Sequence, residues 1–72
     1  MGKVKKRGVI KHVKLEGGFY GFVDDAGQQW ELLDLPKAAQ VDQKTCTLEL
    51  KPIDGETMAM WGQPAKVVRV LE

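Results

Sequence analysis

Hydrophobic and polar residues alternate along most of this 72-residue chain, with the period of two that is typical of β-strands. The alternation is cleanest in segment 44–50. There Cys46, Leu48 and Leu50 share one side, and threonine and glutamate occupy the other. A strand with one buried face is therefore predicted for this segment.

Other short segments, bounded by glycine, proline or aspartate, also predict strands. They are residues 8–15, 19–23, 28–33, 57–61 and 65–71. The first of them has apolar residues on both faces, which suits a long, curved strand that bends at Gly8 and serves two sheets in turn. Pro36 favours a short helical turn after the third strand, because proline fits the first turn of a helix.

This order of elements is that of an OB-type barrel. The predicted fold class is therefore all-β, a small five- to six-stranded OB-like barrel with a short helical turn after the third strand. A small open roll of similar strands is the rival fold. The length suits one domain over residues 1–72, since a chain of this size has room for a single core.

Composition is that of an ordinary globular domain, with 43% hydrophobic and 29% charged residues. No apolar run approaches the roughly 20 residues needed to cross a bilayer, so no membrane span is predicted. The chain moves from Met1 straight into basic residues, without the apolar core of a secretory signal. We therefore expect the cytoplasm by default, with export the alternative if a native leader preceded Met1.

The formal net charge is only +1, but basic residues crowd the start of the chain. They are Lys3, Lys5, Lys6, Arg7, Lys11 and Lys14. Residues 1–7 are expected to form a basic segment that is solvated or frayed, since lysines discourage pairing at a strand edge. The alternative is a local basic strip that meets phosphates.

Two stretches, Gly8-Val9-Ile10-Lys11 and Tyr20-Gly21-Phe22-Val23, resemble the first two strands of cold-shock domains, with one residue inserted. In that family the two aromatics beside the central glycine face outward and stack on bases. The resemblance implies this role for Tyr20 and Phe22 and places His12 near a position where the family has a stacking aromatic. If the chain binds nucleic acid in this way, we expect Lys11, Lys14 and the basic residues 3–7 to contact phosphates.

The third predicted strand, 28–33, departs from the family because it lacks the family's aromatic motif. Asp24, Asp25 and Glu31 are expected near the same surface, where they would repel phosphates. A looser similarity to short prokaryotic domains, some of them exported, covers residues 15–21, 34–36 and 60–64. It favours the OB-like fold and implies no activity.

Catalytic and metal-binding patterns are absent from the sequence. One histidine, one cysteine and no serine give no nucleophile with a base beside it, so no enzyme activity, metal or cofactor is expected. Cys46 is predicted in the core. Trp30 and Trp61 are predicted as core anchors with bonded indole N–H groups, or alternatively as an aromatic patch for a partner.

The sequence therefore predicts a small non-enzymatic binding module. One version binds single-stranded RNA or DNA through the face of the first three strands, using Lys11, His12, Lys14, Tyr20 and Phe22. The other is a protein-interaction or structural module, in which the same aromatics form an apolar contact patch for an unidentified protein.

Overall fold

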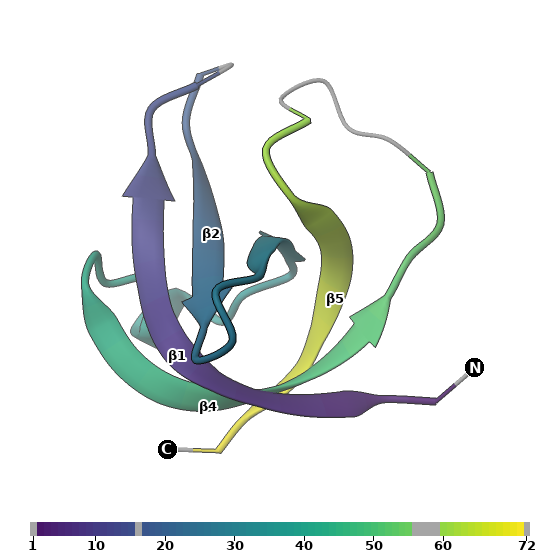
Figure 1. Ribbon diagram of the computed structural model, residues 1–72. Coiled ribbons are helices and arrows are strands. Elements are labelled where there is room, and N and C mark those ends of the chain that lie inside the picture. Colours follow the sequence, from purple (N-terminus) through teal and green to yellow (C-terminus); the bar gives the residue numbers. More distant parts are fainter. Residues whose placement is uncertain (1, 16, 56–59, 72) are drawn as a thin grey trace.

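Five strands and one short 3-10 helix form the described part of the protein (Figure 1). The computed structural model describes residues 2–15, 17–55 and 60–71. The elements are β1 (Val4–Val13), β2 (Phe19–Asp24), β3 (Gln29–Leu33), η1 (Lys37–Ala39), β4 (Lys44–Pro52) and β5 (Gln63–Val70). The predicted all-β class and the helical turn after the third strand are confirmed.

The strand predicted at 57–61 falls mainly on residues 56–59, which lie outside the described residues. Met60 and Trp61, at its end, are not part of a strand. The following strand, β5, starts two residues earlier than predicted, at Gln63. Five strands are therefore seen in the described residues.

The strands close into a barrel in the order β1-β2-β3-β5-β4, with β4 returning to β1. All neighbouring pairs are antiparallel except β3 and β5, which are parallel. This arrangement is consistent with the predicted small OB-like barrel. We call the parallel pairing of Trp30–Leu33 with Gln63–Lys66 the seam of the barrel.

β1 is long and curved because it pairs with two strands. Its residues 4–10 pair with β4 and its residues 8–13 pair with β2, so the two pairings overlap near Gly8 (Figure 1). A Cβ atom on Gly8 would collide with the backbone of Val23 and Asp24. Glycine is needed here because two backbones approach closely.

The basic N-terminal segment is more ordered than predicted. Lys5, Lys6 and Arg7 are strand residues in β1, and Lys5 and Arg7 are exposed, so from Val4 onward the structure shows the solvated alternative and not the frayed one. The physical reason is that Val4 packs against the core and pairs with Leu50. Burial of the valine and the ladder of backbone hydrogen bonds together hold this end of the strand.

The core consists of the inward side chains of all five strands, closed by residues around η1. Its members are Ile10, Phe22, Trp30, Leu32, Leu35, Ala39, Cys46, Leu48, Leu50, Ala65 and Val67. The predictions for segment 44–50 and for the buried cysteine are confirmed. Among the described residues, no helix has the length and apolar character to cross a membrane.

Candidate binding face

Phe22 lies in the core and is 0% exposed, so its predicted outward position is wrong. Its partner on β1 is Ile10 and its partner on β3 is Trp30, and both are buried as well. These three large side chains fill the barrel at one level. A ring with no exposed surface cannot stack on a nucleic-acid base.

Tyr20 shares the inward side of β2 with Phe22 but lies near the end of the barrel, where it is half-buried. Its hydroxyl donates a hydrogen bond of 3.2 Å to the carbonyl oxygen of Gln40. Its ring lies 5.0 Å from the His12 ring, centroid to centroid. Tyr20 therefore packs against the molecule and does not stand on the outer face of β2.

The five predicted binding residues do not form one surface. His12 is exposed beside Tyr20, and its backbone N–H donates to Asp42 Oδ1 at 2.7 Å. Lys11 lies on the opposite side of β1 from His12, because successive strand residues point to opposite faces. Lys14 is exposed just beyond the end of β1. Only Lys11 belongs to the outer face of β1 to β3.

A different aromatic pair occupies that outer face. Gly21 points outward, and a Cβ atom there would collide with the ring of Trp61, which covers the glycine. The rings of Phe19 and Trp61 meet edge to face, with centroids 5.9 Å apart and planes at 68°. Trp61 is thus half-buried on the outside of the barrel, and its prediction as a core anchor is wrong.

The Trp61 backbone is held by a buried carboxylate. Glu31 Oε2 accepts hydrogen bonds from the N–H groups of Trp61, at 2.5 Å, and Gly62, at 2.9 Å. Glu31 is the β3 partner of Gly21, so these bonds fix the tryptophan above the glycine. We define the outer face by Lys11, Phe19, Gly21, Glu31 and Trp61.

The carboxylates near this face are less exposed than predicted. Glu31 and Asp24 are each only 5% exposed, so the expectation of exposed carboxylates is wrong for both, although Glu31 belongs to the outer face. Glu31 is turned toward two backbone N–H groups, and Asp24 lies on the inward side of β2. Of the three acids considered, Asp25 alone is exposed. Repulsion of phosphates by this face is accordingly weaker than the sequence suggested.

Asp24 joins the core to the β2–β3 turn. Its Oδ2 accepts the indole N–H of Trp30 at 2.9 Å, which confirms that this tryptophan is a core anchor with a bonded N–H group. Its Oδ1 accepts the backbone N–H groups of Ala26 and Gln28 at 3.0 and 2.9 Å. The Trp30 hydrogen bond, followed by the backbone bonds, holds the pKa of Asp24 below its ordinary value despite burial.

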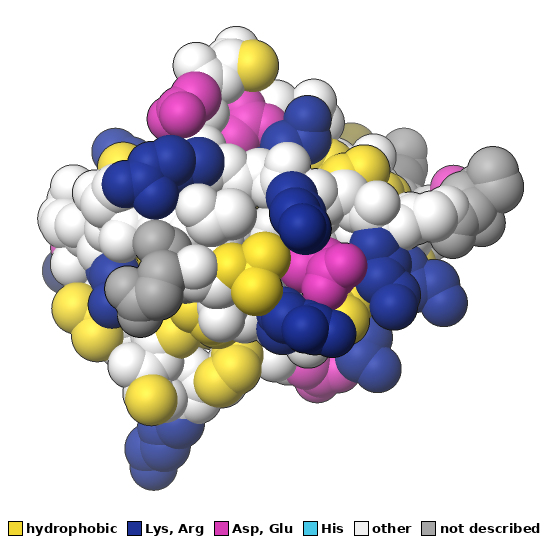
Figure 2. All heavy atoms as spheres, turned by 90° about the horizontal axis from the view of Figure 1, so that it is seen from below, with side chains coloured by type: hydrophobic (Ala, Val, Ile, Leu, Met, Phe, Trp, Pro, Cys, Tyr) yellow, Lys and Arg dark blue, Asp and Glu magenta, His cyan; other side chains and the backbone are white. Residues whose placement is uncertain are grey.

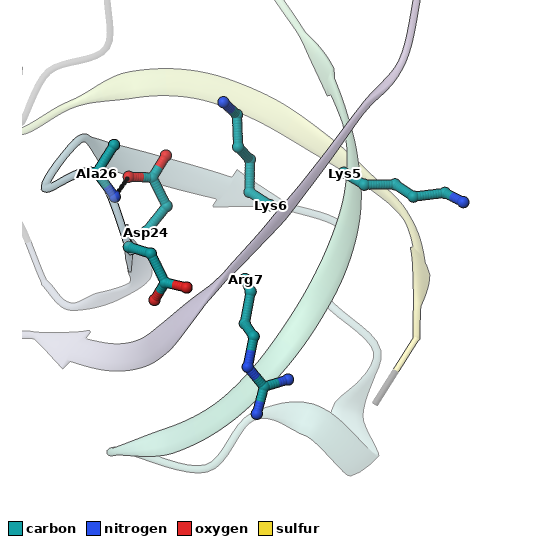
Figure 3. A pocket seen from close by; sticks show the side chains of 6 residues that line it. Lys5, Lys6, Arg7, Asp24 and Ala26 are labelled. Carbon is teal, nitrogen blue, oxygen red and sulfur yellow. Dashed lines mark hydrogen bonds between the residues drawn. The ribbon is translucent and has the colours of Figure 1, made fainter.

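The basic segment of β1 borders a recess of about 190 Å³ near the same turn. Lys5, Lys6 and Arg7 point in different directions around it (Figure 3). Arg7 instead donates to Thr47 Oγ1 at 3.3 Å, and Asp24 and Asp25 also line the recess. Cations that diverge, beside two carboxylates, do not make a pocket for one anion.

Phe19 was not predicted as a binding residue, and Trp61 was predicted as one only in the alternative of an aromatic patch for a partner. The period of two puts Phe19 on the face of Gly21, so the strand pattern contained a signal for Phe19 once Phe22 was placed inward. For Trp61 the sequence contained none, because its position depends on a contact between distant segments. The described residues contain no group of three or more His, Cys, Asp or Glu that could hold a metal ion.

Comparison of the chain with protein-family models, with curated proteins and with solved structures finds no match.

Proposed function

We propose that this protein is a small non-enzymatic binding module that takes single-stranded nucleic acid on the outer face of β1 to β3. The observation that carries the proposal is the Phe19–Trp61 pair on that face, beside Lys11. Stacking of a base on an aromatic ring contributes about 1–3 kcal/mol and tolerates any base. The expected ligand is therefore a single strand of DNA or RNA, bound without strong sequence preference.

Cations on the outer side of β1 supply the phosphate contacts. Lys5, Arg7 and Lys11 are separated by two and then four residues, and even separations place them on the same side of the strand. Three phosphate contacts on a single strand give a slope of about −2 for log affinity against log salt. Such a slope predicts weak binding at physiological salt and clear binding at low salt.

The test is amide chemical-shift mapping of labelled protein, titrated at low salt with pooled short single-stranded DNA and RNA. Shifts are expected at Lys11, Phe19 and Gly21 and at the indole N–H of Trp61. The buried indole N–H of Trp30, which is bonded to Asp24, is an internal control. Absence of shifts at the outer face at low salt would overturn the proposal.

Two matched variants separate this face from the one suggested by sequence resemblance. Phe19→Leu removes a ring from the outer face and should weaken binding about fivefold to a hundredfold, the loss of one stacked base. Tyr20→Leu removes a ring at the end of the barrel and should change affinity less than twofold. Equal losses in both variants would contradict the assignment of the face.

A third variant moves Trp61 without replacing it. Gly21→Ala places a methyl group where the Trp61 ring lies, so the ring must leave its position over β2. Tryptophan fluorescence should shift to the red as the ring enters water, and affinity for single strands should fall. Gly2→Ala is the control, because a Cβ atom there meets nothing within 4 Å.

A protein partner is the second candidate, favoured by aliphatic side chains around the same face. Val9, Val13 and Val23 are half-buried on the outer side, and Leu33 at the end of β3 is 41% exposed. Such a rim suits an apolar contact with another protein. A titration that shows no response to nucleic acid, together with partner binding that is insensitive to salt, would favour this function.

A further inference from the structure

A second surface, separate from the outer face, lies between η1 and the C-terminal half of β5. It is a groove of about 490 Å³ lined by Pro36, Ala38, Ala39, Lys44, Val68, Arg69 and Val70. Figure 2, which shows the molecule from below, has hydrophobic side chains near its centre with Lys and Arg side chains around them and some Asp and Glu side chains among these. Five of the seven side chains that line the groove are apolar, and the other two, Lys44 and Arg69, are basic.

One edge of β5 faces this groove without a strand beside it. β3 pairs with β5 only as far as Lys66, so residues 67–70 have no partner strand on that side within the described residues. On the other side, the N–H of Leu71 donates to the Thr47 carbonyl of β4 at 2.7 Å. In an antiparallel ladder, the backbone groups of successive residues point alternately toward the partner strand and away from it. Because Leu71 bonds to β4, the N–H and C=O groups of Val70 point away from β4 and toward the groove.

The charges at the rim favour an acidic occupant. Arg69 pairs with Glu49 at 3.0 Å, and Lys66 lies 4.0 Å from Asp34. Lys37 and Lys44 have no carboxylate within 4.0 Å in the described part of the chain. Of these two lysines, Lys44 lines the groove, and Lys37 lies in η1 between the lining residues Pro36 and Ala38.

We propose that this groove binds an extended peptide in which apolar residues alternate with carboxylates, and that the peptide adds a strand to the free edge of β5. Backbone hydrogen bonds to the edge would supply affinity. The apolar side chains of the peptide would pack against Val68, Val70 and Ala38, while its carboxylates would face Lys37 and Lys44.

A second copy of the chain is a poorer occupant of the same groove. A symmetric contact between two β5 edges would bring the basic rim of one copy against the same basic rim of the other. Like charges held close together disfavour such an interface. An acidic peptide meets the same edge without this repulsion.

The probe is a synthetic eight-residue peptide of alternating valine and glutamate, and its control alternates valine and lysine. Titrated into labelled protein, the acidic peptide should shift the amides of residues 37–39, 44 and 67–70 and leave Lys11 and Phe19 unchanged. No shift in the groove, or equal binding of the lysine peptide, would overturn the proposal.

Two substitutions with matched controls test the groove without altering the core. Ala38→Glu puts a carboxylate on an exposed wall and should weaken binding of the acidic peptide about threefold to tenfold. Ala26→Glu makes the same change on the distant β2–β3 turn and should have no effect. Lys44→Glu should weaken the acidic peptide and improve the lysine peptide, a reversal that unfolding cannot produce.

Sedimentation of the protein alone tests whether a second copy of the chain, and not an acidic peptide, occupies the groove. The proposal expects a monomer over the concentrations of the titration. Self-association that shifts the amides of residues 67–70 and is abolished by Ala38→Glu would overturn the peptide proposal. It would identify a second copy of the chain as the occupant of the groove.

Discussion

At the residue scale, Asp24 connects the β2–β3 turn to the core through one carboxylate. One of its oxygens accepts hydrogen bonds from two backbone N–H groups, and the other accepts one from the indole N–H of Trp30. All three donors lose their bonds if the acceptor is lost, and buried donors without an acceptor are costly. Asp24 therefore stabilises both the turn and the position of the largest core side chain.

Asp24→Asn tests this role with a nearly isosteric change. Asparagine can offer its oxygen either to the backbone donors or to Trp30, and its NH₂ group then faces the remaining donor. We expect the free energy of unfolding to fall by about 1–3 kcal/mol in urea titrations. Asp25→Asn, at the exposed neighbour, should change it by less than about 0.5 kcal/mol. Equal effects would contradict the proposed anchor.

The lowered pKa of Asp24 also predicts a dependence of stability on pH. Because its Trp30 bond favours the charged form in the folded state, the pKa lies below the value of about 3.9 for an unfolded chain. The stabilisation is complete above that value and is lost as pH falls through the folded pKa. The stability difference between wild type and Asp24→Asn should stay constant from pH 7 to pH 5 and shrink at lower pH. A difference that persists unchanged to pH 2 would argue against ionised Asp24 as its source.

At the element scale, the strand pattern defined β4 more accurately than β2. In segment 44–50 only one face is apolar, so the side that enters the core follows directly from the alternation. In β2, by contrast, Phe19 lies on one face and Tyr20 and Phe22 lie on the other. Alternation alone does not determine which of these faces is buried.

The packing of Trp61 decides the orientation of β2. Its ring needs the space over Gly21, and Glu31 holds its backbone there. These contacts join segments that are far apart in sequence, so no local pattern could reveal them. The resemblance to cold-shock domains implied an outward position for Tyr20 and Phe22, whereas the structure places both on the inward side of β2.

A substitution at Gly8 tests whether β1 needs a glycine where its pairings with β2 and β4 overlap. Gly8→Ala forces a methyl group against the backbone of β2, and backbone cannot yield as a flexible side chain can. Overpacking of this kind costs about 1–3 kcal/mol or more. Urea unfolding should show this loss, whereas Gly2→Ala should be neutral. A neutral Gly8→Ala would mean that the strands can separate there without cost.

At the scale of the whole molecule, the barrel depends on the seam between β3 and β5. The seam joins only Trp30–Leu33 to Gln63–Lys66, whereas β1 and β4 pair along residues 4–10 and 44–50. Parallel pairing is also slightly less stable per residue than antiparallel pairing. The seam is therefore the place where the closed barrel is expected to open into a curved sheet.

Native-state hydrogen exchange can measure that opening. Amides bonded across the seam should exchange with a lower free energy of opening than amides of the β1–β4 pair, because local opening needs fewer broken contacts. Identical values for both sets would show that the barrel opens only by global unfolding. The same measurement bears on function, since Trp61 and Gly62 directly precede the seam and are held by Glu31 of β3.

If single-stranded nucleic acid binds the outer face, it binds protein molecules whose seam is closed in preference to molecules whose seam is open. A ligand at a hundred times its dissociation constant then slows exchange at the seam by up to about a hundredfold, which corresponds to about 2.7 kcal/mol. Oligonucleotide at low salt should produce this protection, and Phe19→Leu should reduce it. The acidic peptide, which contacts residues 67–70 beyond the seam, should protect β5 without depending on Phe19. Protection by oligonucleotide that survives Phe19→Leu unchanged would place the nucleic acid elsewhere on the molecule.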